Sequence, residues 1–151
     1  MTSGYTDGEA LIASLVAGVT GFAAAQVTRG NWKPIGSGKA AVYAIIHTEP
    51  VGRRNFTSPR TPVDRWLTTV EVWRRYVDDG TSYTQLGAYV EDIVAKIDKY
   101  PHLGDGSGYV EESTAEYGKV QEMWKRGGGP AWLRQDVLIT WTGRQTITYS
   151  D

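Results

Sequence analysis

The segment nearest to a known catalytic motif is a glycine-rich turn ending in lysine, Gly36-Ser37-Gly38-Lys39. A phosphate-binding loop needs two glycines that bracket four residues, followed by lysine and a hydroxyl residue that opens a helix. Here Lys33 occupies the place of the first glycine, and Ala40, which has no hydroxyl, follows the lysine. The next residues, AVYAIIH, are typical of a strand. The segment is therefore predicted to be a turn that leads into a strand.

The other reactive side chains form no recognisable catalytic or metal-binding pattern. The chain has no cysteine and two histidines, His47 and His102, and it lacks a Gly-x-Ser-x-Gly elbow. The turn GDGSG supplies one carboxylate, Asp105, where a calcium loop needs alternating acidic ligands and a final glutamate. We predict no catalytic residue, metal site or cofactor. A small enzyme stays an alternative, which titratable groups clustered in one pocket would support.

The composition is that of an ordinary globular protein. The chain has 151 residues, 40% of them hydrophobic and 22% charged, and its formal net charge is -1. This length fits one domain, residues 1–151. The near-neutral charge provides no general attraction for nucleic acid. The motif WRRY beside an arginine-rich loop leaves single-stranded nucleic-acid binding as an alternative, because aromatic platforms with basic neighbours bind single strands.

The N-terminal apolar run ALIASLVAGVTGFAAAQ predicts a helix over residues 7–24. Thr6 and Glu9 have the spacing of a capping box. The run is not expected to be a signal peptide, because the residues before it contain no lysine or arginine. It is also shorter than the roughly 20 residues that span a bilayer. We therefore expect a protein made and kept in the cytoplasm, with no membrane partner.

A helix-strand pattern continues along the rest of the chain. A strand is predicted over 40–47, a flexible loop over 48–65 with three prolines and four arginines, and a second strand in TTVEVWRRYV. A helix follows, capped by Ser82 with Gln85 three residues later, and Pro101 forbids its continuation. Its apolar stripe consists of Leu86, Tyr89, Val90, Ile93, Val94 and Ile97.

Two further strands are predicted after a Gly-rich loop over 101–114. The segment TAEYGKVQEMWK forms the third strand and AWLRQDVLITWTG the fourth, with Leu133, Val137, Ile139 and Trp141 on one side. The order α-β-β-α-β-β predicts an α+β fold. Two helices are expected to pack on one face of a mainly antiparallel four-stranded sheet.

Tryptophan is the compositional anomaly of this chain, which contains six. Alternation along the second strand places Trp73 with Glu71 and Arg75, on the side opposite Val70 and Val72. Aromatic and arginine side chains that share a surface are typical of the centres of protein–protein interfaces. We therefore predict that this side of the strand contacts another protein.

The chain resembles the tail terminator family of long-tailed bacteriophages. The resemblance lies in the order of elements over residues 7–142: the apolar N-terminal helix, the strand AVYAIIH, the long loop, TTVEVWRRYV, the helix YTQLGAYVEDIVAKI and the strand DVLITWTG. It implies a structural virion protein rather than an enzyme. Such proteins form a hexameric ring that caps the tail tube, stops its polymerisation and offers a surface for head attachment.

The resemblance also implies partners and roles for particular residues. The partners are other copies of the chain, the tail tube protein and a head-completion or connector protein, while DNA only passes through the lumen. The loop arginines would pair with carboxylates of a neighbouring subunit or ring. Trp73 and Trp141 would anchor the subunit contact or the core beneath it. Another phage neck or head-completion ring protein is the main alternative. The predicted interface residues are Arg53, Arg54, Arg60, Arg65, Glu71, Trp73, Arg75 and Trp141.

Overall fold

The computed structural model describes residues 4–22, 26–30, 41–55, 62–124 and 130–144; the side chains of 53–55, 62, 79, 124 and 130 fall outside this description. The elements follow the order α1 (Tyr5–Ala17), β1 (Val27–Arg29), β2 (Val42–Asn55), β3 (Pro62–Arg75), α2 (Asp79–Lys99), β4 (Val110–Trp124) and β5 (Pro130–Arg144). Trp32 and the RGGGP turn up to residue 129 lie outside the described residues.

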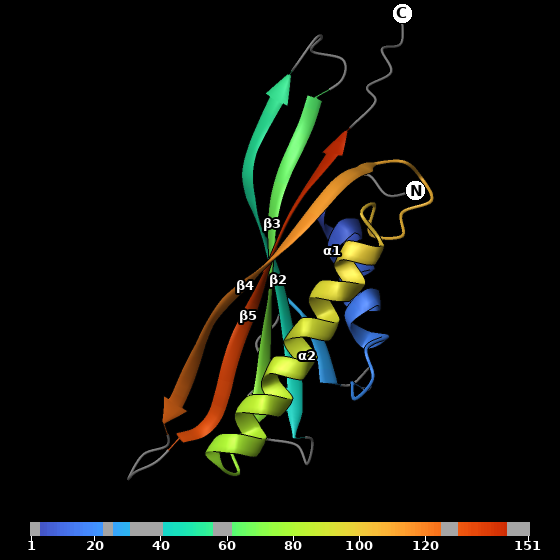
Figure 1. The fold of residues 1–151 in the computed structure, drawn as a ribbon. Coiled ribbons are helices and arrows are strands. Elements are labelled where there is room, and N and C mark those ends of the chain that lie inside the picture. Colours follow the sequence, from blue (N-terminus) through green and yellow to red (C-terminus); the bar gives the residue numbers. More distant parts are fainter. Residues whose placement is uncertain (1–3, 23–25, 31–40, 56–61, 125–129, 145–151) are drawn as a thin grey trace, which may run out of the picture.

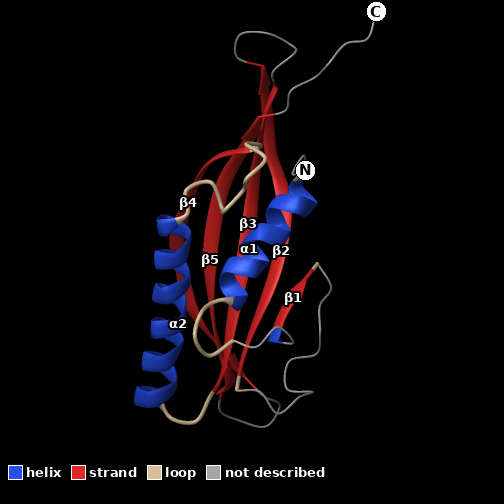
Figure 2. Cartoon of the chain, turned by 90° about the vertical axis from the view of Figure 1, so that its right-hand side faces the viewer, coloured by secondary structure: helices blue, strands red, loops and turns tan. Residues whose placement is uncertain are grey.

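A twisted sheet with strand order β1-β2-β3-β5-β4 forms one layer, and both helices lie on the same face of it (Figure 1, Figure 2). The predicted α+β class and the single helical layer are confirmed. The prediction of four strands is wrong, because β1 adds a fifth, parallel to β2. A strand of three residues is too short to show an alternating pattern in the sequence. β1 is a strand only because it pairs with residues 44–46 of β2.

Most of the predicted loop 48–65 is strand. β2 continues to Asn55 and β3 begins at Pro62, so that only residues 56–61 lie outside the described residues. Prolines are tolerated here for positional reasons: Pro62 is the first residue of its strand, and Pro50 lies beyond the part of β2 that pairs with β1. Proline is rare inside a sheet because it has no N–H to donate to a neighbouring strand, and an edge position does not need that hydrogen bond. The pairing register between β2 and β3 shifts after Pro50, where Val51 forms a bulge.

The first helix is shorter than predicted and is capped differently. It ends at Ala17 rather than near residue 24, because Gly18 closes it and Gly21 adopts a positive φ against which the Tyr89 ring packs. The N-cap is Gly4, with no side-chain cap, so the predicted capping box does not form. Glu9 is buried and instead forms an ion pair with Arg29 of β1 at 3.3 Å.

The second helix has the predicted apolar stripe but begins earlier. Asp78 is the N-cap and accepts a hydrogen bond from the Thr81 amide at 2.6 Å. Ser82 lies one turn inside the helix, where its buried Oγ accepts from the Val77 amide at 2.7 Å. Gln85 accepts from the buried guanidinium of Arg74 and so ties the helix to β3. Ser82 therefore binds the backbone just before the helix, and Gln85 makes a tertiary contact; neither forms the predicted cap.

The Gly-rich loop is shorter than the predicted 101–114, because β4 begins at Val110. Asp105 organises the turn before it: its carboxylate accepts from the amides of Ser107 at 2.9 Å and Val110 at 3.0 Å. These hydrogen bonds fix the turn that leads into β4. β4 has fifteen residues and confirms the third predicted strand. The predicted inward side of β5 is confirmed, since its four apolar residues are buried.

The core lies between the helices and one sheet face, which we call the covered face. Trp141 is its largest fully buried side chain. The Trp141 ring lies against the backbone of α1 at Gly8, where any Cβ would overlap the indole. Its Nε1–H donates to Thr68 Oγ1 at 2.9 Å. Around it lie the rings of Trp66, at a centroid distance of 6.1 Å, and Tyr109, at 6.3 Å.

Candidate assembly interface

The sheet face opposite the two helices carries the predicted interface residues of β3. We call it the open face, because no described helix covers it. Alternation places Glu71, Trp73 and Arg75 there. The strand register sets Tyr43 of β2 and Arg134 of β5 on either side of Trp73, and Trp132 beside Arg75. His47 and Asp136 complete this group of eight side chains, which we call the open-face cluster.

Glu71 makes polar contacts with three other side chains of the open-face cluster. Its Oε2 accepts a hydrogen bond from His47 Nε2 at 2.7 Å, and its Oε1 accepts from Trp73 Nε1 at 3.2 Å. Arg134 Nε lies 3.6 Å from the same Oε1. A carboxylate only accepts, so the His47 contact requires the proton on Nε2. Glu71 therefore accepts the hydrogen bond of the Trp73 indole N–H and fixes the orientation of the indole ring.

Arg134 forms a bidentate pair with Asp136 on the same strand, with Nε–Oδ1 and Nη2–Oδ2 distances of 2.9 Å and 3.0 Å. This hydrogen bonding raises the pKa of Arg134 above the usual arginine value, partial burial lowers it, and the charges of Asp136 and Glu71 raise it further. The guanidinium therefore stays charged throughout the physiological range. The bidentate pair with Asp136 fixes the guanidinium plane, and Glu71 adds an ion pair.

Both tryptophan rings of the cluster lie close to an arginine guanidinium group. The Arg134 guanidinium carbon is 5.4 Å from the Trp73 ring centre, and that of Arg75 is 5.5 Å from the Trp132 ring centre. Tyr43 packs on Trp132 with a centroid distance of 5.8 Å. Trp73 is only 8% exposed, whereas Tyr43 and Trp132 are half-buried and still reach solvent. The solvent-accessible aromatic surface of the cluster therefore centres on Tyr43 and Trp132.

The other predicted site residues are not part of this group. Two roles were predicted for Trp141, an anchor of the subunit contact or part of the core. Its full burial on the covered face assigns it to the core. Arg65 lies on the open face farther along β3, at a hollow of about 600 Å³ that Glu111, Glu112 and Thr142 also line. Arg53 and Arg54 belong to β2, but their side chains, like all of Arg60, lie outside the described residues.

Sequence reasoning missed five members of the open-face cluster: Tyr43, His47, Trp132, Arg134 and Asp136. Part of the signal was available, since the side of β5 opposite its apolar residues carries Trp132, Arg134 and Asp136 in alternation. The missing information was the register that brings β2 and β5 to the two sides of β3. Register depends on pairing between distant segments and cannot be read from one strand.

In the described ranges, no group of three or more histidine, cysteine, aspartate or glutamate side chains is arranged to hold a metal ion. None of the described helices is both long and apolar enough to cross a membrane. No protein-family model matches the chain, and no curated protein matches its sequence.

Proposed function

We propose that the protein is a phage tail terminator: a virion protein whose copies form a hexameric ring that caps the tail tube and receives the head. The open-face cluster is the observation that supports this proposal. It presents rings and guanidinium groups on the sheet face that none of the described helices covers, and Tyr43 and Trp132 reach solvent there. Rigid aromatic anchors beside arginines are enriched at the centres of protein interfaces.

The cluster suits a contact between rigid bodies. Its side chains are held before any partner arrives, because Glu71 binds His47 and Trp73 while Asp136 holds Arg134. Preorganised side chains lose little conformational entropy on docking, so more of the contact energy appears as affinity. A subunit of this kind stops tube growth when one surface of its ring matches the tube end and the other surface does not.

Native mass spectrometry of the purified chain over a concentration series, together with a tube-capping assay, tests the proposal. We expect a discrete hexamer and protein bound at one end of purified tail tubes, which then no longer elongate. Tubes that elongate normally in excess protein would overturn the terminator function. Binding to the head connector but not to the tube would instead support a neighbouring neck or head-completion ring protein.

The arginines of the β2–β3 hairpin provide a second test. Replacing Arg53, Arg54, Arg60 and Arg65 with alanine is expected to abolish tail attachment and to leave the melting temperature of the monomer nearly unchanged. A charged side chain at a protein surface generally contributes about 0–1 kcal/mol to folding, whereas an interface can depend on several such charges together. A collapse of the melting temperature would show that the hairpin arginines are structural and would remove them from the assembly surface.

The open-face cluster also bears on the nucleic-acid alternative, because Tyr43 and Trp132 with Arg75 resemble a base-stacking platform. Glu71 and Asp136, directly beside the rings, oppose a phosphate backbone. Titration with oligothymidylate, monitored by tryptophan fluorescence, separates the two functions. We expect no saturable quenching at physiological salt. Saturable, salt-sensitive quenching that Trp132→Ala removes would favour the nucleic-acid function.

A further inference from the structure

His47 is the only histidine of the open-face cluster, and it lies at the carboxylate that holds this cluster together. Its Nε2 is 2.7 Å from Glu71 Oε2. The side chain of His47 is 47% exposed, so water and protons reach it, whereas that of Glu71 is only 13% exposed. Histidine is the side chain whose ordinary charge change falls between about pH 5 and pH 8. The charge of the cluster therefore depends on His47 in this range.

The charges around Glu71 do not balance when His47 is neutral. Among the described residues, Arg134 is the only arginine or lysine in contact with Glu71, with its Nε 3.6 Å from Oε1. Arg134 is also shared, because it forms its closer, bidentate pair with Asp136 at 2.9 Å and 3.0 Å. Two carboxylates therefore face one guanidinium group, and one negative charge is left over.

The described parts of the neighbouring strands bring no second cation to Glu71. The next open-face side chain of β2 is another carboxylate, Glu49, which is exposed. β3 places the uncharged Thr69 opposite the histidine. Arg29 of β1 forms its ion pair with Glu9 of α1, on the covered face. Protonation of the histidine is therefore the change within the cluster that supplies the missing positive charge.

A partner that covers the open face would make this imbalance costly. Water beside the exposed imidazole screens the excess negative charge in the free protein. A carboxylate that loses its water is destabilising unless a cation compensates it. With His47 protonated, two carboxylates meet two cations, as the pairs His47–Glu71 and Arg134–Asp136. The covered state therefore favours the protonated histidine more than the free protein does.

We propose that His47 takes up a proton when a partner covers the open face, so that a lower pH favours assembly. The sign follows from linkage, because an association that binds a proton shifts forward as the proton concentration rises. The inference rests on the proposed function, since it takes the open face as the assembly surface. It adds to that function the control of this surface by pH.

Sedimentation velocity over a concentration series measures the linkage, from an alkaline limit of about pH 8 to an acidic limit of about pH 6. The concentration needed for half-maximal assembly should fall roughly tenfold between the two limits, which corresponds to about one unit of pKa difference between the free and the assembled state. A half-maximal concentration that stays constant, or that rises on acidification, would overturn the proposal.

Two variants of the pair separate charge from hydrogen bonding. His47→Gln keeps an N–H that can donate to Glu71 but takes up no proton. It should assemble at both limits as weakly as the wild type at the alkaline limit. Glu71→Gln keeps an acceptor for Trp73 and removes the excess charge. It should assemble at the alkaline limit about as strongly as the wild type at the acidic limit. Equal weakening of both variants would indicate a purely structural pair and would overturn the proposal.

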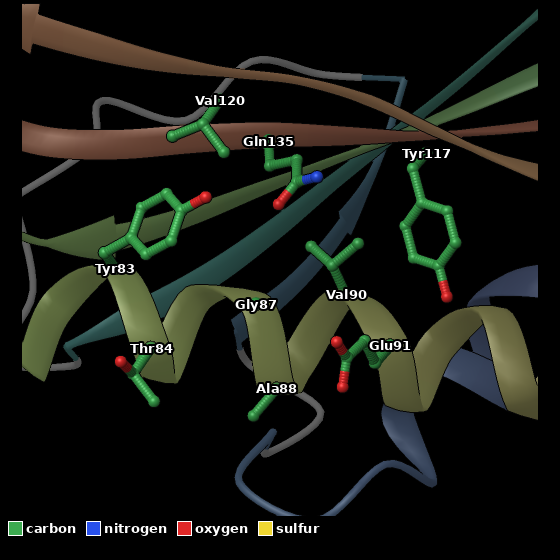
Figure 3. Close-up of a pocket in the computed structure, with 9 residues that line it drawn as sticks. All are labelled: Tyr83, Thr84, Gly87, Ala88, Val90, Glu91, Tyr117, Val120 and Gln135. Atoms are coloured by element: carbon green, nitrogen blue, oxygen red, sulfur yellow. The ribbon is translucent and has the colours of Figure 1, made fainter.

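Two matched controls lie away from the open-face cluster. His102→Gln removes the only other histidine of the chain. Glu91→Gln removes a carboxylate of α2 that lines the groove between this helix and β4, on the covered side of the sheet (Figure 3). Both variants should keep the pH dependence of the wild type. Its loss in either one would place the responsible group outside the open-face cluster and contradict the proposal.

The outcomes distinguish this inference from the proposed function. A ring that caps tail tubes and assembles equally at both pH limits would refute the role of His47 and leave the terminator function standing. Assembly that depends on His47 and pH, from a protein that does not stop tube growth, would support the inference and refute the terminator function. A chain that stays monomeric and leaves tail tubes unbound at both limits would refute both.

Discussion

The two faces of the sheet carry the same residue type under opposite conditions. Trp66 and Trp141 lie on the covered face, and Trp73 and Trp132 lie on the open face. On the covered face the Trp141 indole is enclosed by α1 and donates to the hydroxyl of Thr68. On the open face Trp73 donates to a carboxylate and lies under a guanidinium group.

This difference shows two ways to satisfy a tryptophan. A helix and a neutral hydroxyl complete the environment of Trp141, so its burial contributes to folding. Charged groups screen Trp73 from water but leave Tyr43 and Trp132 partly accessible. The covered face is already enclosed by the helices, and we propose that a partner buries the open face further. Mutations on the two faces should separate folding from assembly.

The largest expected effect is that of Trp141→Ala. Removing a fully buried tryptophan is expected to lower the free energy of unfolding by about 3–5 kcal/mol. Trp132→Ala should cost less than half of this, because the ring is half-buried, and should instead weaken assembly. Urea unfolding, at a protein concentration where the chain is monomeric, measures the stability of both variants. Equal losses of stability would abolish the distinction between the faces.

A pair of threonines sharpens the comparison at the level of single hydrogen bonds. Thr68→Val removes the acceptor of the Trp141 indole and should cost about 1–3 kcal/mol, the penalty for a buried unsatisfied donor. Thr142 on β5 is the matched control, since among the described residues its buried hydroxyl has no hydrogen-bond partner. Thr142→Val should be neutral within about 0.5 kcal/mol, or stabilising. Thermal unfolding of both variants decides, and a destabilising Thr142→Val would contradict this account.

Two helical glycines test the packing of the helices. Gly8→Ala should destabilise the protein, because the overlap with the Trp141 ring costs about 1–3 kcal/mol while the gain in helix propensity is about 1 kcal/mol. Gly87→Ala meets no atom within 4 Å and should stabilise it by about 0.5–1 kcal/mol. Opposite signs in chemical unfolding are expected, and two stabilising substitutions would mean that α1 does not press on Trp141.

The smallest effect concerns pH and the open face. Arg134 has a raised pKa, so its pairing contributes stability that is fully present below the unfolded-state pKa and is lost only as the pH rises through the folded value. Arg134→Lys should cost about 0.5–1 kcal/mol near pH 8 and more as the pH rises through about 10–11, where lysine titrates. The difference in unfolding free energy between variant and wild type is measured at each pH. A difference independent of pH would show that charge is unimportant there.

The sequence predicted the parts of the fold that depend on local periodicity. The stripe of α2 and the inward side of β5 were correct because helical and strand repeats determine which side chains share a face. The capping box at Thr6 and Glu9 was wrong because Glu9 has a better partner in Arg29, on another element. The predicted loop over 48–65 was wrong because proline and bulge positions in a strand depend on which edge is unpaired.

The sequence alone determined that the chain forms two apolar-striped helices and long alternating strands, and that Glu71, Trp73 and Arg75 share one face. Tertiary structure alone decided that β1 pairs with β2, that Gly8 meets Trp141, and that Arg134 lies over Trp73. The physical reason is that side-chain periodicity is encoded within each segment. Register and helix placement, in contrast, result from the joint packing of segments that are distant in the chain.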